Sequence, residues 1–206
     1  MGHAAATPDA RQPATQADLA RLPEHLVGEI IDGELHSQPR PSGPHGVTEA
    51  ELMTDLGSAF GRGRGGPGGW WILIEPQLHL EPHILVPDLA GWKRERMPRV
   101  PDDHRFTVVP DWVCEILSPS TARKDRIQKM RIYAESGVAH CWLLDPLART
   151  LETYELQAGK WLLLASHGGD TRFRAPPFDA VEFELGAWWL PEDDPPQDTA
   201  GDPAGG

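Results

Sequence analysis

Apolar residues recur at helical spacing in two segments of the chain. The first segment carries Val47, Ala50, Met53, Leu56 and Phe60. The second segment covers residues 123–136, with Ile127, Met130 and Ala134 on one face and Gly137 placed where a helix would end. The pattern therefore predicts two main helices, with the face of Ile127 directed toward the core.

Other segments are rich in β-branched and aromatic residues, which is typical of strands. These segments are 70–80, 84–92, 112–117, 139–144 and a closing hairpin of 151–155 with 161–166. Near the N-terminus, Asp32-Gly33 separates two strand-like runs within 27–37 and predicts a β-hairpin. Thr15 and Asp18 fit a capping box that opens a short helix before it. The alternation indicates an α/β (α+β) fold with a central mixed β-sheet flanked by helices.

Both ends of the 206-residue chain differ in composition from its middle. Residues 1–14 are rich in Ala, Pro and Gln, and residues 191–206 hold five acids, four prolines and no base. Neither segment can bury enough apolar surface to offset the entropy of folding. We therefore expect two disordered ends around a single domain at 15–190.

The chain has 19 Lys and Arg against 31 Asp and Glu, a formal charge of −12. This balance argues against a protein that coats nucleic acid non-specifically, but a local basic patch remains compatible with it. Cys114 and Cys141 both lie in apolar runs, as expected of buried free thiols in a reducing compartment. No signal-peptide pattern and no run of about 18 apolar residues is present, so we expect a cytoplasmic protein without a membrane segment.

A glycine-rich run, Gly61-Arg62-Gly63-Arg64-Gly65-Gly66, matches the letters of a nucleotide-binding loop. Such a loop needs a strand before it and a helix after it. Here a helix is expected before it and a strand after it, so the run is interpreted as a flexible connector.

Two acids stand inside otherwise apolar strand-like segments. Glu115 lies within 112–117, and Asp88 lies within 84–92. A buried carboxylate is costly unless it is paired, hydrogen-bonded or bound to a cation. Two such acids on neighbouring strands would form an oxygen-rich pocket suited to Mg²⁺ or Mn²⁺. A buried salt bridge, or two acids at exposed edges, explains the pattern equally well.

Basic residues follow both acid-bearing segments. At 100° per residue, Asp125 and Lys129 lie on the same side of the second helix, away from the apolar stripe of Ile127. They form either an ordinary ion pair or an arrangement that brings Lys129 to the two acids. The candidate contacts to a DNA phosphodiester are Lys93, Arg94, Arg123, Lys124 and Arg126. Solvated surface charge is the commoner role of such runs.

The order of these motifs resembles the Uma family of "putative restriction endonucleases", within the PD-(D/E)XK nuclease superfamily. The resemblance rests on Val86-Pro87-Asp88-Leu89, on the segment from Pro110 to Thr121 with Glu115-Ile116-Leu117-Ser118-Pro119-Ser120-Thr121, and on Asp125 followed by Lys129. It covers roughly residues 15–160 and implies a restriction-endonuclease-like core that cuts DNA with Mg²⁺ (or Mn²⁺). It also raises the expectation of a homodimer.

The resemblance further implies roles for individual residues. Asp88 and Glu115 would be catalytic and metal-binding. The lysine that the superfamily pattern expects two residues after the glutamate is Leu117 here, so Lys129 would take that role, with Lys124 as the substitute. Glu34 of the hairpin would add a catalytic acid, and Glu49 is a weaker candidate. The missing lysine and the acidity favour an alternative, a catalytically degenerate DNA-binding or protein-interaction module.

Overall fold

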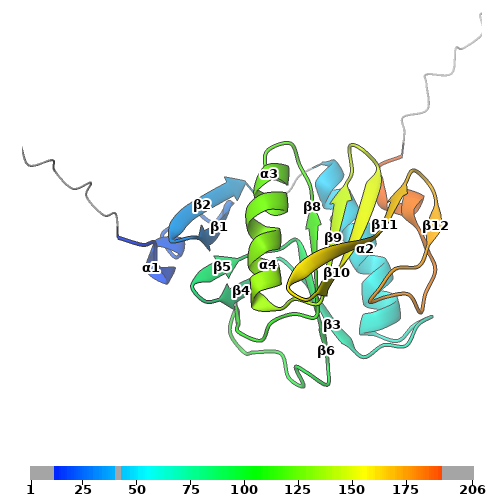
Figure 1. The fold of residues 1–206 in the computed structure, drawn as a ribbon, viewed down its shortest axis with the longest axis horizontal. Coiled ribbons are helices and arrows are strands. Elements are labelled where there is room, and N and C mark those ends of the chain that lie inside the picture. Colours follow the sequence, from blue (N-terminus) through cyan, green and yellow to red (C-terminus); the bar gives the residue numbers. More distant parts are fainter. Residues whose placement is uncertain (1–11, 40–42, 192–206) are drawn as a thin grey trace, which may run out of the picture.

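The computed structural model describes residues 12–39 and 43–191, which form two sheets, a short ribbon and the helices that cover them (Figure 1). The predicted disordered ends lie almost wholly outside these residues. Within the part that is described, no helix is long and apolar enough to cross a membrane.

A six-stranded mixed sheet forms the centre, in the order β11-β10-β9-β8-β6-β3. Its strands are β3 (Trp70–Ile74), β6 (Leu89–Lys93), β8 (Trp112–Ile116), β9 (His140–Asp145), β10 (Thr150–Gln157) and β11 (Lys160–Gly168). Only β8 and β9 are parallel, and the other neighbours are antiparallel. The α/β class and the central mixed sheet are thus confirmed.

A smaller five-stranded sheet, in the order β2-β1-β5-β4-β7, stands beside the central one. Its strands are β1 (Leu26–Ile31), β2 (Glu34–Pro39), β4 (Gln77–Leu80), β5 (His83–Leu85) and β7 (Arg105–Phe106). A ribbon of β12 (Arg172–Phe173) and β13 (Phe183–Glu184) leads into a 3₁₀ turn, η3 (Leu185–Trp188). The first two helices are α1 (Gln16–Leu19) and α2 (Pro44–Leu56), and α2 continues into a π-helical turn, η1 (Gly57–Gly61). The last helix is made of three consecutive parts: α3 (Ala122–Lys124), a second π-helical turn η2 (Asp125–Lys129) and α4 (Met130–Ser136).

Both faces of the central sheet are covered, and β8 shows this most clearly. Trp112, Cys114 and Ile116 pack with residues of α2 and the C-terminal ribbon. Val113 and Leu117 pack on the other face with residues of α4 and the small sheet. Glu115 lies between Val113 and Leu117 in the alternation of the strand, so its side chain enters the covered face of α4.

Two predicted strands are each divided between the sheets. Segment 70–80 is β3 of the central sheet and β4 of the small one, interrupted at Glu75-Pro76. Segment 84–92 is β5 and β6, interrupted at 86–88. A proline in each break has no N–H for a sheet ladder. Asp88 therefore lies at the junction of the two sheets rather than inside a strand.

The helix predicted at 123–136 exists, but its predicted apolar face is only partly buried. Met130 is buried as expected, whereas Ile127 is 59% exposed and the polar side chains of Asp125 and Lys129 are buried instead. The π-helical turn over Asp125–Lys129 is the reason, since its wider hydrogen bonding changes the angular phase that a regular 100° step assumes. The end at Gly137 is confirmed, with this glycine in the left-handed conformation at φ 83°.

Several local predictions are confirmed. Thr15 and Asp18 form the capping box of α1, and Asp32 and Gly33 make the turn between β1 and β2. The first main helix is also present. Leu56 and Phe60 of the predicted stripe are buried, but Thr48 and Leu52 take the other buried positions, and Ala50 is exposed. Both cysteines are buried free thiols.

Gly91 in β6 is packed between two aromatic rings. A Cβ there would stand 3.2 Å from Cε3 of Trp112 and 3.3 Å from Cε3 of Trp70. We expect Gly91→Val to lower the free energy of unfolding by about 1–3 kcal/mol, because the added methyl groups overpack the core. Urea denaturation measures this. Gly46→Val is the control, since a Cβ at Gly46 meets no atom within 4 Å. Equal losses of stability at both positions would contradict the tight packing of Trp70 and Trp112 around Gly91.

Candidate active site

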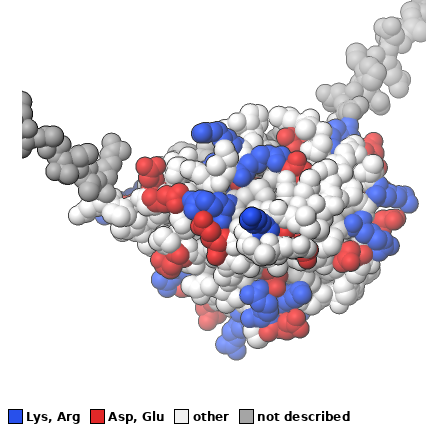
Figure 2. Space-filling model, in the orientation of Figure 1, with Lys and Arg blue, Asp and Glu red and all other residues white. Residues whose placement is uncertain are grey.

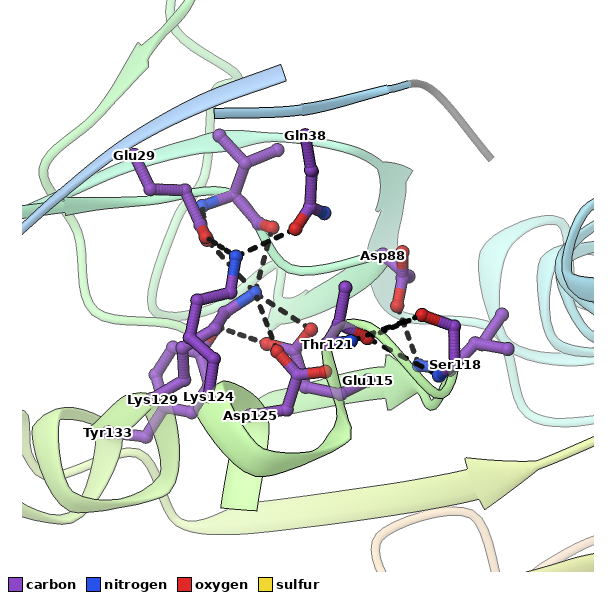
Figure 3. A network of polar contacts seen from close by, with 12 residues as sticks. Glu29, Gln38, Asp88, Glu115, Ser118, Thr121, Lys124, Asp125, Lys129 and Tyr133 are labelled. Atoms are coloured by element: carbon purple, nitrogen blue, oxygen red, sulfur yellow. Dashed lines mark hydrogen bonds and ion pairs between the residues drawn. The ribbon is translucent and has the colours of Figure 1, made fainter. Parts of the chain in front are cut away.

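The candidate site lies where the two sheets meet, against the helix of η2 and α4 (Figure 3). Asp88 immediately precedes β6, and Glu115 is the fourth residue of β8. Because β6 and β8 are antiparallel with Leu89 opposite Cys114, both acids lie at the same end of the central sheet. The two acids were predicted on neighbouring strands. The strands β6 and β8 are neighbours, but Asp88 stands just before β6 rather than within it.

The ammonium group of Lys129 is the centre of a buried network. Its Nζ donates to Oε2 of Glu115 at 2.8 Å and to the carbonyl oxygen of Val86 at 3.0 Å. It also pairs with Oε1 of Glu29 at 3.0 Å, while Oδ1 of Asp125 stands farther away at 3.9 Å. An ammonium has three N–H donors, and these three near contacts use all of them.

A second lysine supports the network from outside. Lys124 Nζ donates to Oε2 of Glu29 at 2.5 Å and to Oε1 of Gln38 at 2.7 Å. The amide of Val86 donates to Oε1 of Glu29 at 3.0 Å. Burial opposes the ionisation of Glu29, but the charges of Lys129 and Lys124 outweigh it and lower the pKa of this carboxyl to about 2. Glu29 is therefore an ionised link between the hairpin and the helix.

Asp88 and Glu115 are each held by other groups as well. Oδ2 of Asp88 accepts the backbone N–H of Ile116 at 2.6 Å, and Oδ1 lies 2.9 Å from Nε2 of His45. Tyr133 donates its hydroxyl to Oε1 of Glu115 at 2.5 Å. These contacts fix the orientation of both carboxylates from the backbone and from the flanking helices.

Acids outnumber bases around the site, and the pKa values reflect this. Burial raises the pKa of Glu115 well above its ordinary value, and nearby Asp125 and Asp88 add to the effect. Burial likewise raises the pKa of Glu49, with the charge of Asp88 next in importance, to about 7. Oε1 of Glu49 is buried and lacks a hydrogen-bond partner among the described residues. A bound cation would relieve both the charge surplus and this unsatisfied oxygen.

The donor set fits Mg²⁺ or Mn²⁺ better than a soft metal. Within 12–39 and 43–191, no group of three His, Cys, Asp or Glu side chains is arranged to hold a metal ion. Mg²⁺ does not require such a cage, because it is commonly bound by one or two carboxylates together with water and substrate phosphate. Asp88 and Glu115 supply two carboxylates at one end of the sheet, and their oxygens are hard ligands.

Comparison with known proteins identifies the family and the fold of the chain. A family model, Uma2, described as "Putative restriction endonuclease", matches residues 17–186. The chain belongs to this family. A search of curated proteins gives no match. A crystal structure of "a putative nuclease belonging to DUF820" from Anabaena variabilis ATCC 29413 is similar, with a TM-score of 0.69 and 24% identity over 85% of this chain and 99% of that one. This likeness shows that the two proteins share a fold.

Among the residues predicted for the site of this Uma2 chain, the structure brings Asp88, Glu115 and Lys129 together but not Glu34. Glu34 is exposed at the start of β2, opposite Ile31 at the turn end of the hairpin. The hairpin acid that reaches the site is Glu29, which the sequence reasoning missed. Glu29 lies inside the apolar run Leu26–Ile31, just as Glu115 lies inside its own apolar strand, so the same signal marks both acids.

The five bases predicted to contact DNA do not gather in one place in the structure. Lys93 ends β6 and Arg94 follows it, as the sequence order predicts, but this is the end of the strand opposite to Asp88. Lys124 is turned into the network, and Arg126 pairs with Glu152 at 2.6 Å. Arg123 is exposed near the start of the helix. Figure 2 shows the same mixture on the face it presents, with bases and acids interspersed.

The pKa of Glu29 leads to an acid-dependent stability. Because the folded-state pKa of about 2 lies below the ordinary value of 4.5, the stabilisation is present above about pH 4.5 and is lost as the pH falls toward 2. Glu29→Gln should lower the free energy of unfolding by about 3 kcal/mol at pH 7 and by much less near pH 3. Urea titrations at the two pH values measure this. Glu51→Gln, at an exposed position of α2, is the control; a pH-independent loss in Glu29→Gln would argue against the ionised link.

The two tyrosines of the chain offer a matched pair of substitutions. Tyr133→Phe removes a buried hydroxyl from Glu115 and should cost about 1–3 kcal/mol of stability, because a buried acceptor loses its donor. Tyr154→Phe removes a half-buried hydroxyl that donates to Glu152 and should cost less than about 1 kcal/mol. Thermal and urea unfolding compare them; equal costs would mean that the Tyr133 hydroxyl contributes little.

Proposed function

We propose that this Uma2-family protein is a metal-dependent endonuclease that hydrolyses DNA phosphodiester bonds. The observation that carries the proposal is the convergence of Asp88, Glu115 and Lys129 at one end of the sheet. Two carboxylates and one ammonium are the groups that this hydrolysis requires, and Lys129 replaces the lysine that is missing at Leu117. The homodimer expected from the resemblance stays a prediction.

In this proposal Asp88 and Glu115 hold Mg²⁺ or Mn²⁺ through their carboxylate oxygens. The metal would lower the pKa of an attacking water and offset charge on the transferring phosphoryl group. The backbone N–H of Ile116 and the ring of His45 orient Asp88, while Tyr133 orients Glu115. The protein thus supplies fixed ligands that need little rearrangement when the substrate binds.

The role of Lys129 is limited by its hydrogen bonds. All three of its donors are engaged, so contact with a phosphate oxygen or a water requires that one be exchanged. The contact with Glu29 is the least costly to give up, because Glu29 retains Lys124 as a partner. Lys124 therefore has a function in the proposal even though it does not replace Lys129: it keeps Glu29 paired when Lys129 turns to the substrate.

The competing proposal is a binding module that has lost turnover, and the engagement of Lys129 together with Leu117 favours it. Nicking of supercoiled plasmid DNA with Mg²⁺ or Mn²⁺ distinguishes the two. We expect cleavage by the wild type and a loss of about 100-fold or more in Asp88→Asn and Glu115→Gln, because each removes a charged metal ligand.

Asp111→Asn is the matched control for this experiment. Asp111 is as buried as Asp88, but it lies at the other end of the sheet, where it accepts the backbone N–H of Lys93 and pairs with Arg96. If Asp111→Asn reduces cleavage as much as Asp88→Asn does, the loss reflects folding rather than chemistry. Absence of metal-dependent cleavage by the folded wild type on linear, supercoiled and single-stranded DNA would refute the nuclease.

Metal binding has a readout that does not depend on cleavage. Mn²⁺ should raise the melting temperature of the wild type, since a ligand that binds only the folded state stabilises it. The rise in melting temperature should be smaller in Asp88→Asn and Glu115→Gln than in the wild type. In Asp111→Asn it should equal that of the wild type. Differential scanning calorimetry over a series of Mn²⁺ concentrations measures this; an equal rise in all four proteins would place the metal elsewhere.

A further inference from the structure

A concave surface lies away from the acidic site, between the end of the first main helix and the edge strand β3. It has a volume of about 520 Å³, and its polar lining includes Arg62, Arg64 and Arg94, with Trp70 and Trp71 beside them. We call this surface, defined by the three arginines and two tryptophans, the basic groove. No acidic residue is among the described residues that line it.

Arg94 is fixed in the basic groove by three contacts. Its Nε donates to the carbonyl oxygen of Trp70 at 3.2 Å, and Nη2 donates to the carbonyl oxygen of Gly61 at 2.7 Å. Its guanidinium carbon stands 4.1 Å from the centre of the Trp71 ring, a cation–π arrangement. Two of its five N–H groups are thus bound to carbonyls, and the guanidinium is held in place to present others to a ligand.

The glycine-rich run that was interpreted as a flexible connector is anchored to the helix end. The amides of Arg62, Arg64 and Gly68 donate to carbonyl oxygens of Gly57, Ser58 and Ala59 at 2.9–3.0 Å. A Cβ on Gly66 would stand 2.8 Å from the carbonyl oxygen of Ala59, so the loop approaches the helix as closely as only glycine permits. The loop therefore holds Arg62 and Arg64 at the rim of the groove.

The arginines of the basic groove are unlike most other bases of the protein. Arg21, Arg96, Arg105, Arg126, Arg131, Arg149 and Arg172 each pair with a carboxylate. Within the described ranges, Arg62, Arg64 and Arg94 form no ion pair with a carboxylate. Glu182 and Glu184 line the next surface beyond Arg64, which marks the end of the basic area. Three unpaired guanidinium groups around one hollow, in a chain of charge −12, indicate an anionic ligand.

The basic groove and the acid pair lie at opposite ends of β6. Asp88 and Arg94 are six residues apart, which is about 20 Å in extended chain at about 3.3 Å per residue. One strand of DNA advances about 3.4 Å per nucleotide, so about six nucleotides would bridge this distance. The spacing suits a polymer that passes over both ends of the strand better than a single nucleotide.

We propose that the basic groove binds the phosphodiester backbone of DNA about six nucleotides from the acid pair. Arg62 and Arg64 contact phosphate oxygens from the rim, and Arg94 contacts a phosphate from its position on Trp71. The inference takes DNA as the partner from the proposed function, but it does not depend on cleavage. Because the contacts are to phosphates, they position the nucleic acid without reading its sequence.

The test is binding without divalent metal, measured by fluorescence anisotropy on a labelled DNA duplex of about two helical turns. The double variant Arg62→Ala/Arg64→Ala should weaken binding about tenfold or more at low salt. It should also lower the slope of log K against log salt by about 2, one for each lost phosphate contact. The control is Arg21→Ala/Arg105→Ala, which removes the same charge from two exposed arginines with local carboxylate partners.

Each outcome decides the inference separately from the nuclease proposal. Loss of binding in the groove variant alone supports the groove, even if the wild type never cuts DNA. Equal binding by the groove and control variants, or an unchanged salt slope, overturns it, even if the protein is an active nuclease. A labelled mononucleotide that binds as tightly as the duplex, through the same arginines, would replace the DNA backbone by a small phosphate ligand and overturn it as well.

Discussion

The arrangement of the site depends on one buried charge, the ammonium of Lys129, whose side chain is 2% exposed. Removing an ion from water costs several kcal/mol, which only close partners can offset. Those partners come from three separate parts of the chain: Glu29 from β1, the carbonyl of Val86 from the link between the sheets, and Glu115 from β8. The lysine therefore fixes the hairpin, the sheet junction and the helix with respect to one another. A chain that misplaced any of them would leave a charge unpaired in the core.

The same charge explains the orientation of the helix. A regular helix would bury Ile127, which is worth about 1.5–3 kcal/mol of transferred apolar surface. Leaving Lys129 or its acids without partners would cost about 3–5 kcal/mol. The π-helical turn over Asp125–Lys129 resolves the conflict in favour of the charges, and Ile127 is left 59% exposed. Turns of this kind occur frequently at functional sites because they place a side chain where the regular helix would not.

This conflict also sets the limit of what the sequence could predict. Local signals sufficed for the capping box at Thr15, the turn at Asp32-Gly33 and the helix end at Gly137, because each depends on a few adjacent residues. Asp88 and Glu115 could be selected because an acid in an apolar run stands out. Glu29 also lies in an apolar run, but the family resemblance implies Glu34 as the acid of the hairpin. Pro76 and Pro87 mark the two breaks locally, but which sheet each half of a divided strand joins depends on contacts that are distant in sequence.

The two ends of β6 carry opposite charge, and this difference suits them to different roles. Near Asp88 the carboxylates exceed the bases, and the pKa of Glu49 is raised to about 7 by burial and by Asp88. A phosphate brought to this end meets net repulsion unless a cation is bound first. At the other end, Arg62, Arg64 and Arg94 of the basic groove would attract phosphate without a metal. Under the proposed function, the groove would hold DNA in either state, while the acid pair would accept the phosphodiester only when it carries its metal. If both proposals hold, the net charge of −12 is compatible with a nuclease, because attraction of DNA and the chemistry would belong to opposite ends of one strand.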